Sequence, residues 1–196
     1  MISGGILLAV AGWAFTFALD WGNFWIKIGL TVMVTCLYSL FWQKPALSFR
    51  PRNAALGVLA ALLLYGIFYL GFALSPFVVP DAVRLVGDVY ARGDGTSATA
   101  VVLLLLFVTG PGEEVFWRGF LQENLMARYG DGAGFAMTTL IYGTVHVFSL
   151  NFMLVLAAFV AGAFWGGLYL WRRDLVPVMV SHSLWSACIF AVFPIR

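Results

Sequence analysis

The sequence has little charge and few of the residues that commonly bind metals or carry redox chemistry. Only 10% of its 196 residues are charged, and it contains two histidines, two cysteines and three glutamates. Cys36 and Cys188 lie in apolar runs without metal-ligand spacing, so we interpret them as core residues. The net charge of +2 is too small to indicate a nucleic-acid partner. These absences argue against a soluble charged domain and against a nucleic-acid-binding protein.

Apolar residues instead make up 62% of the chain, and the mean hydropathy is +0.95. This composition is typical of an integral membrane protein. We therefore predict an all-α fold, a polytopic transmembrane helical bundle of about seven spans, because each span needs roughly 20 helical residues. We expect one integral membrane domain over residues 1–196, without internal repeats. The apolar runs are Ile2–Leu19, Asn23–Trp42, Ala54–Val79, Thr96–Ala127, Ala133–Leu150, Phe152–Trp171 and Leu175–Phe193.

Basic residues in the short loops predict the orientation of this bundle. If the N-terminus is cytoplasmic, most of the loop lysines and arginines fall on the cytoplasmic side, as positive-inside topology requires. The cytoplasmic set is Lys44, Arg50, Arg52, Arg128, Arg172 and Arg173, and the opposite set is Arg84, Arg92 and Arg196. The first apolar run has no basic segment before it and no convincing cleavage site. We therefore expect a retained helix rather than a signal peptide.

The one long linker, Asp81–Ala100, has two interpretations. Val83, Val86 and Tyr90 recur there at helical spacing, with charged residues between them. This pattern predicts a short interfacial helix that gates access from the outer side. A solvated connector is the alternative.

The stretch Gly110–Gly119 places two carboxylates and a guanidinium within an apolar run. A charge at membrane depth costs roughly 2.5 to 3.5 kcal/mol, so such residues usually face a partner or a water-filled cavity. Glu114 and Arg118 are four residues apart, which predicts an ion pair on one helix face. Glu113 lies about 100° round the helix and is left for another partner. Pro111 and the glycine after it predict a kink or a helix start just before the carboxylates. The structural interpretation is a salt bridge that only holds helices together.

The two histidines, His146 and His182, lie in apolar runs on different predicted helices. A lone membrane histidine is often a hydrogen-bonded packing residue. Counting about 1.5 Å of rise per residue, however, brings both to within about two turns of the depth of Glu113. Three costly polar groups on separate helices at similar depth predict one shared site.

A carboxylate and two imidazoles in a wet pocket are sufficient for water-driven amide hydrolysis. Glu113 would act as general base towards a water held between it and His146. His182 would donate a hydrogen bond to the oxyanion that forms. The same groups could instead hold zinc with one position open for water, although the sequence lacks a His-Glu-x-x-His helix motif.

The motif Glu113-Glu114-Val115-Phe116-Trp117-Arg118 resembles the Glu-Glu-x-x-x-Arg motif of the CPBP intramembrane proteases. This family comprises CAAX proteases and bacteriocin-processing enzymes and is also called the ABI family. Tyr142-x-x-x-His146 resembles its second motif, and His182 in the last helix resembles its final motif. The resemblance covers about residues 110–186, which we expect to carry the catalytic motifs.

The resemblance implies that Glu113 and His146 activate the water, that His182 helps to stabilise the oxyanion, and that Glu114 and Arg118 support the site. The family usually has Asn or Asp four residues after the last histidine, where this chain has Ser186. We expect either Ser186 or Asn151 to fill that position.

Family members have been described both as zinc proteases and as metal-free glutamate proteases. We favour the metal-free form, with zinc bound by Glu113, His146 and His182 as the alternative.

The function implied by the resemblance is that of an intramembrane endopeptidase in a bacterial inner (cytoplasmic) membrane. It would cleave near the membrane-associated C-terminus of a membrane protein or lipid-anchored peptide, for example to trim a sorting or anchor tail. Two alternatives remain open. A proton-coupled transporter also uses buried Glu, His and Arg, but we find no inverted repeat. A non-catalytic membrane scaffold or immunity protein would tolerate a serine at position 186.

Overall fold

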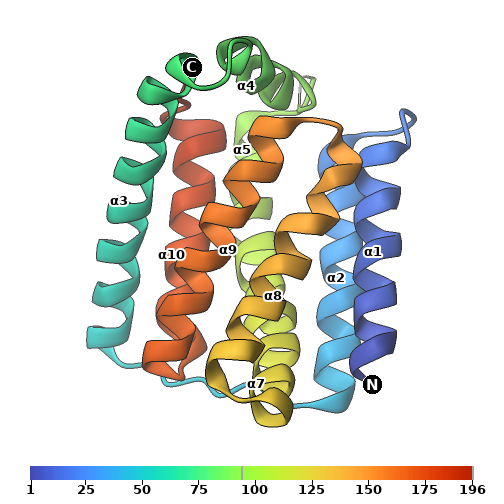
Figure 1. Ribbon diagram of the computed structural model, residues 1–196, viewed down its shortest axis with the longest axis vertical. Coiled ribbons are helices and arrows are strands. Elements are labelled where there is room, and N and C mark those ends of the chain that lie inside the picture. The colour runs from blue at the N-terminus through green and yellow to red at the C-terminus, as the bar shows by residue number, and fades with distance from the viewer. Residues whose placement is uncertain (94, 196) are drawn as a thin grey trace.

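The computed structural model describes residues 1–93 and 95–195, and its regular elements are all helices (Figure 1). The predicted all-α fold is therefore confirmed for this part of the chain. Arg196, which entered the orientation argument, lies outside the described residues. The α-helices are α1 (Ile2–Ala18), α2 (Phe24–Trp42), α3 (Pro51–Leu74), α4 (Ala82–Ala91), α5 (Ala98–Leu104), α6 (Gly110–Glu114), α7 (Glu123–Tyr129), α8 (Asp131–Val145), α9 (Phe152–Arg172) and α10 (Leu175–Ala187).

Five helical segments are long and apolar enough to cross a membrane. Helix α1 is also apolar but has 17 residues, and α8 has 15. Helices thus occupy every predicted apolar run, and the chain is an integral membrane protein. Of the about seven predicted spans, five meet the length and hydropathy of a full span. The five segments are Phe24–Trp42, Pro51–Phe77, Ala98–Tyr129, Phe152–Arg172 and Leu175–Val192.

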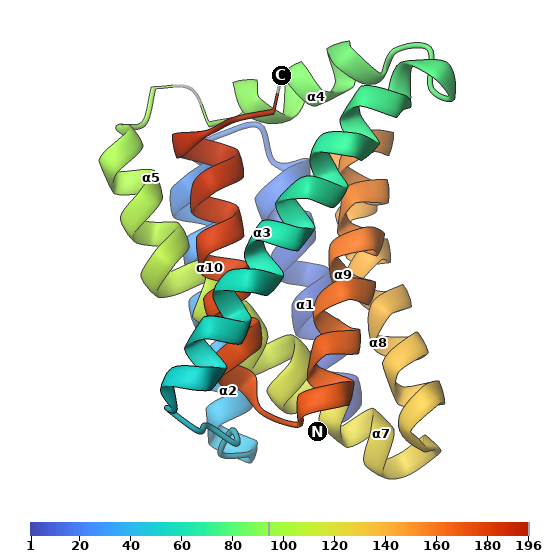
Figure 2. The ribbon, with the colours of Figure 1, turned by 90° about the vertical axis from the view of Figure 1, so that its left-hand side faces the viewer.

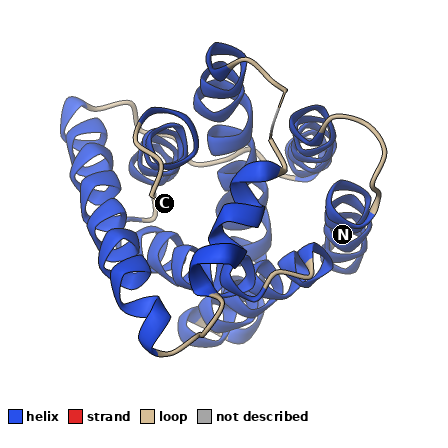
Figure 3. Ribbon diagram, turned by 90° about the horizontal axis from the view of Figure 1, so that it is seen from above, coloured by secondary structure: helices blue, strands red, loops and turns tan. Residues whose placement is uncertain are grey.

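The long helices stand side by side, and α4 lies across one end of the bundle (Figures 1 and 2). The N-terminus, α7 and the end of α9 lie at the opposite end. Seen from above, helices surround the centre of the bundle on all sides (Figure 3). The basic loop residues of the predicted cytoplasmic set therefore gather at the N-terminal end, away from α4. Which end faces the cytoplasm stays a prediction.

Helix α4 confirms the helical interpretation of the linker, and polar contacts fix it to the start of α9. The Nδ2 atom of Asn151 donates to the carbonyl oxygen of Leu85 at 2.7 Å. The Nη2 atom of Arg92, just after α4, donates to the carbonyl oxygen of Ser149 at 2.6 Å. The Leu85 acceptor is a main-chain atom of α4, so the first contact locates the α4 backbone over the end of the bundle, and the second ties the residue after α4 to the turn before α9.

The charged stretch lies within one continuous helical segment, residues 98–129. The kink or helix start predicted just before the carboxylates is a change of helix type within this segment, and a bend of the helix axis there stays a prediction. Pro111 stands at the beginning of α6, directly after a π-helical turn at Leu105–Thr109, and a second π-helical turn follows at Val115–Gln122. A proline lacks the backbone donor that a regular α-turn needs, and here the chain widens into π-turns, which often occur at functional sites.

Two glycines permit the close helix contacts that bring the polar residues together. A Cβ atom at Gly112 would lie 2.6 Å from Cγ1 of Val32, so only glycine lets α6 approach α2 this closely. A Cβ atom at Gly162 would lie 2.8 Å from Cδ1 of Tyr142, which brings α9 against α8. A larger residue at either place would push apart helices that carry the site.

Candidate active site

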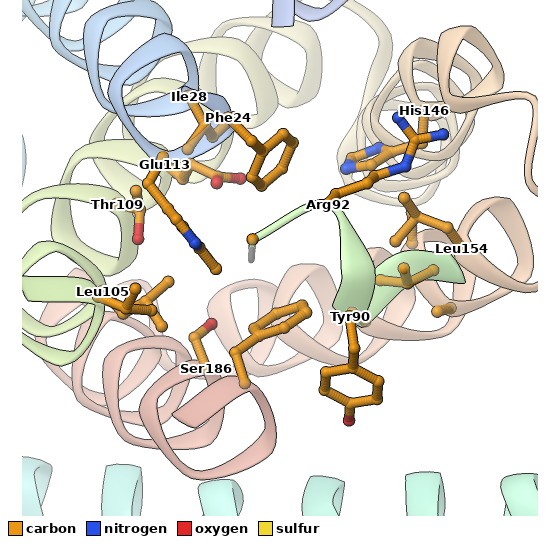
Figure 4. Close-up of a pocket in the computed structure, with 18 of the residues that line it drawn as sticks. Phe24, Ile28, Tyr90, Arg92, Leu105, Thr109, Glu113, His146, Leu154 and Ser186 are labelled. Carbon is orange, nitrogen blue, oxygen red and sulfur yellow. The ribbon is translucent and has the colours of Figure 1, made fainter. Parts of the chain in front are cut away.

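A cavity of about 310 Å³ lies inside the bundle, and Glu113, His146 and His182 all line it. Glu113 comes from α6, His146 from the 3₁₀ turn that follows α8, and His182 from α10. All three side chains are buried. Figure 4 shows Glu113 and His146 at the edge of this cavity. The prediction that three helices bring these groups to one place is confirmed, whereas their catalytic roles stay predictions.

The cavity extends from Glu113 towards the end of the bundle that α4 covers. Phe24 and Trp25 at the start of α2, together with Arg92 and Ala98, line this part of it. Ala98 is exposed. The cavity therefore reaches the surface at the end opposite the N-terminus.

Glu114 connects the first motif to the last histidine. Its Oε1 atom accepts a hydrogen bond from Nη1 of Arg118 at 2.9 Å, which confirms the predicted ion pair. The same oxygen lies 2.6 Å from Nδ1 of His182. Glu114 and Arg118 are almost completely buried, at 0% and 1% exposure of their side chains. Breaking a buried pair leaves an uncompensated charge, so Arg118 keeps the Glu114 carboxylate in place. Glu114 in turn holds His182 in a fixed position.

The His182 ring is held on two sides. A carboxylate only accepts hydrogen bonds, so Nδ1 of His182 carries a proton and donates a hydrogen bond to Oε1 of Glu114. The ring also stacks on Trp165, with centroids 3.8 Å apart and planes 19° from parallel. The indole Nε1 of Trp165 donates to the hydroxyl of Ser181 at 3.2 Å. This leaves Nε2 as the ring nitrogen of His182 that can act on a substrate.

Glu113 has a single hydrogen-bond partner among the described residues, the hydroxyl of Tyr142 at 3.4 Å from Oε2. This distance makes the bond a weak one. Tyr142 is itself placed by Arg118, whose Cζ lies 4.9 Å from the ring centroid, and by its close approach to Gly162. The Glu113 carboxylate therefore retains acceptor capacity on the cavity side, as a general base requires.

Both ring nitrogens of His146 are hydrogen-bonded. Nε2 lies 3.2 Å from the indole Nε1 of Trp13, and Nδ1 lies 2.8 Å from the carbonyl oxygen of Tyr142. An indole N–H can only donate and a carbonyl can only accept. His146 is therefore neutral in this arrangement, with its proton on Nδ1 and its Nε2 lone pair directed at Trp13.

The two candidates for the fourth position lie in different places. Ser186 is buried, lines the cavity one helical turn after His182, and is visible there in Figure 4. Asn151 caps α9, because its Oδ1 accepts from the backbone N–H of Leu154 at 3.0 Å. Its amide nitrogen is engaged with Leu85. Of the two, Ser186 is the one whose side chain is available to a bound molecule.

The arrangement does not form a zinc site. No group of three or more His, Cys, Asp or Glu side chains in the described part of the chain is placed to hold a metal ion. His146 has no free lone pair, and one ring nitrogen of His182, Nδ1, is already hydrogen-bonded to Glu114. Zinc bound by Glu113, His146 and His182 would first have to displace the Trp13 indole. We therefore derive no catalytic step through a metal.

Several residues at the site had no signal in the sequence. Trp13 lies in an ordinary apolar helix 133 residues from its partner His146, and no local pattern marks it. Trp165 resembles an interfacial tryptophan in sequence but lies beneath His182. Arg92 stood only among the loop charges. Arg92 is the exception, because it lies at the end of the amphipathic segment of the linker, just where the chain returns to the bundle, and this place could have indicated it.

The fold is an all-helical membrane bundle with a buried Glu–Arg pair. One glutamate and two histidines line its internal cavity. These features define a membrane protein with an internal polar site. The family model described as "Type II CAAX prenyl endopeptidase Rce1-like" matches residues 95–188. Residues 95–188 thus form a domain of this family, which is a family of peptidases. No curated protein and no solved structure was found to match the chain. The matched segment contains Glu113, His146 and His182, while α1 to α3 precede it.

Proposed function

We propose that this protein is an intramembrane endopeptidase that hydrolyses a peptide bond near the membrane-associated C-terminus of a substrate protein. The observation that carries the proposal is the meeting of Glu113, His146 and His182 at one buried cavity. Membership of a peptidase family supports it over the transporter alternative.

In the proposed reaction, Glu113 removes a proton from a water molecule in the cavity as the water oxygen attacks the peptide carbonyl carbon. The carbonyl oxygen becomes an oxyanion, which receives a hydrogen bond from Nε2–H of His182. For this step we propose the doubly protonated His182 ring, because Nδ1 keeps its own proton in the bond to Glu114. The C–N bond then breaks, and the proton on Glu113 passes to the leaving amine. The products are a new carboxyl terminus and a released C-terminal fragment. Glu114 contributes by holding Nδ1 of His182, which leaves Nε2 directed at the reacting atoms.

The role proposed for His146 requires one rearrangement. Water held between Glu113 and His146 needs the Nε2 lone pair, and Trp13 occupies this lone pair in the structure. We propose that the indole bond opens when substrate and water enter. The Nδ1 bond to the Tyr142 carbonyl can persist throughout and keeps the ring in place.

We propose a membrane protein or lipid-anchored peptide as substrate, in a bacterial inner membrane. The opening of the cavity at the α4 end supports this, because that end is the outer one if the predicted orientation is right. A protein exported with an apolar C-terminal tail would present the tail at that side. The reaction is proposed to need no metal, since the side chains already bond one another in place of an ion.

The test replaces Glu113→Gln and compares the C-termini of membrane proteins in cells with the wild-type and variant chains by mass spectrometry. Glu123→Gln is the matched control, because Glu123 contacts Tyr169 and Arg173 away from the cavity. We expect processed C-termini to depend on Glu113 by a factor on the order of a hundred or more, and not on Glu123. Equal processing by the Glu113 variant would refute the proposed base. No difference from cells without the chain would favour a scaffold.

A metal chelator provides the second arm of this test. The purified enzyme is treated with a strong zinc chelator and its peptide cleavage is measured before and after addition of Zn²⁺. We expect no loss on chelation. Loss of cleavage that Zn²⁺ restores would establish the zinc alternative instead.

A further inference from the structure

Arg92 places a positive charge at the wall of the catalytic cavity. Its guanidinium is fixed at two points: Nη2 donates to the Ser149 carbonyl at 2.6 Å, and Cζ lies 5.8 Å from the centroid of the Phe17 ring. Ser149 ends the 3₁₀ turn that begins with His146. Phe17 also contacts His146, with ring centroids 5.8 Å apart. Arg92 is therefore anchored to the same turn and the same aromatic ring as the proposed catalytic histidine.

This cation has no carboxylate partner within the described residues. Arg84, on the same helix, contacts both Asp81 and Asp88 at about 3 Å. Arg118 has Glu114. A guanidinium carries five donors, and the Ser149 carbonyl is the one acceptor found for Arg92, whose Nε is buried and unsatisfied. The guanidinium thus has donors left for a bound anion.

The cavity around Arg92 favours binding of that anion. It is lined by Phe17, Phe24, Trp25 and other apolar side chains, and a charge–charge contact is stronger there than in water. In the view of Figure 4, Arg92 and Glu113 lie on opposite sides of the cavity. An anion at Arg92, just after α4, would therefore lie in the part of the cavity near the α4 end and away from Glu113.

We propose that Arg92 binds the C-terminal carboxylate of the substrate. The inference rests on the proposed function, because it assigns the anion to the chain that Glu113 would cleave. A carboxylate matches the planar guanidinium, which can give it two parallel hydrogen bonds. The cavity of about 310 Å³ is at the small end of ligand pockets. It has room for a short peptide end between Arg92 and Glu113, and not for a folded domain.

One consequence concerns where the substrate is cut. If the carboxylate is held at Arg92 and the bond is cut at Glu113, their separation sets the length of the released fragment. Lengthening a substrate at its C-terminus by two residues then moves the cleavage site by two residues towards the new end. An enzyme that reads only the sequence around the bond would keep cutting at the original place.

The experiment uses the full chain, purified in detergent, and synthetic peptides with an apolar membrane segment followed by a randomised six-residue end. Each peptide set is made once as the free acid and once as the C-terminal amide, and the products are read by mass spectrometry. We expect the wild type to cleave the acids at least about tenfold faster than the amides, the factor expected for losing a charged hydrogen bond. Arg92→Gln should reduce this acid-to-amide ratio to about one.

Arg84→Gln is the matched control and should keep the wild-type ratio, because its guanidinium is satisfied by Asp81 and Asp88. Arg92→Lys keeps the charge but loses the planar fork, and an intermediate ratio is expected. The ratio is taken within one protein sample, so a partly unfolded variant does not distort it.

The outcomes separate the two proposals. Glu113-dependent cleavage with equal rates for acids and amides overturns the Arg92 assignment and leaves the proposed function standing. An Arg92→Gln variant that slows acids and amides equally indicates that the cation holds α4 or a lipid phosphate, and also overturns the assignment. Absence of any Glu113-dependent cleavage in both sets overturns both proposals.

Discussion

The indole of Trp13 donates its N–H to Nε2 of His146 at 3.2 Å, and this bond fixes the tautomer of the histidine. Trp13 belongs to α1, outside the segment that matches the peptidase family, and is almost fully buried. The N-terminal helix therefore contributes directly to the site. It holds His146 neutral and covers the nitrogen that catalysis would use.

Removing the indole donor should expose this nitrogen. In Trp13→Phe, we expect diethyl pyrocarbonate, which acylates imidazole nitrogens with a free lone pair, to modify His146 about two to ten times faster, the factor equivalent to one neutral hydrogen bond. Peptide mass spectrometry gives the rate, with His182 as an internal reference. Trp117→Phe is the control, because its buried Nε1 has no partner within the described structure. Equal labelling of His146 in all three proteins would contradict the assigned tautomer.

The buried Glu114–Arg118 pair should be much more important to stability than an exposed pair. Glu114→Gln leaves the Arg118 guanidinium buried without its counter-charge, which costs about 3 to 5 kcal/mol. Asp81→Asn breaks one exposed contact to Arg84 and should lower the midpoint far less, because water and salt screen a surface pair. The midpoint of thermal unfolding in detergent compares the two variants. A Glu114→Gln midpoint as high as that of Asp81→Asn would show that the pair is not the support inferred here.

The hydroxyl of Ser186 should have a measurable but modest role if it hydrogen-bonds to the reacting carbonyl. Ser186→Ala is expected to lower kcat about two- to tenfold with little change in KM. Ser186→Asn supplies an amide donor with longer reach and should retain at least the wild-type kcat. Ser183→Ala serves as control, since that hydroxyl donates to the Leu106 carbonyl at 3.1 Å and is engaged within the helix bundle. The kcat of Ser186→Ala would equal that of the wild type if position 186 were only structural.

Asn151 should couple the start of α9 to α4, and two substitutions can separate these contacts. Asn151→Asp keeps an oxygen for the Leu154 N–H but loses the amide donor to Leu85. Hydrogen exchange is therefore expected to increase in Ala82–Ala91 alone. Asn151→Ala removes both contacts, costs about 0.5 to 2 kcal/mol through the lost cap, and should also raise exchange at the start of α9. Unchanged exchange in α4 for both variants would show that other contacts hold α4 in place.

The sequence predicted those features that depend on spacing along one helix. Helices lie in every apolar run because the runs are long and apolar enough to bury a helix. Glu114 and Arg118 meet because four residues make about one helical turn. The depth estimate that grouped Glu113, His146 and His182 also relied only on a constant rise per residue. Pro111 predicted a kink or a helix start, but the sequence did not predict the π-helical turns on either side of α6, because helix type there depends on the surrounding packing.

Tertiary structure alone decided which partners the two histidines would have. His146 pairs with Trp13, 133 residues away, and His182 with Glu114, 68 residues away. These choices follow from close helix contacts such as that of Gly162 with Tyr142, which no single-helix pattern contains. The sequence by itself therefore determined that this protein spans a membrane with a few buried charges. Packing between distant helices decided that Glu113, His146 and His182 face one cavity, because these three residues lie on separate elements that only the tertiary fold brings together.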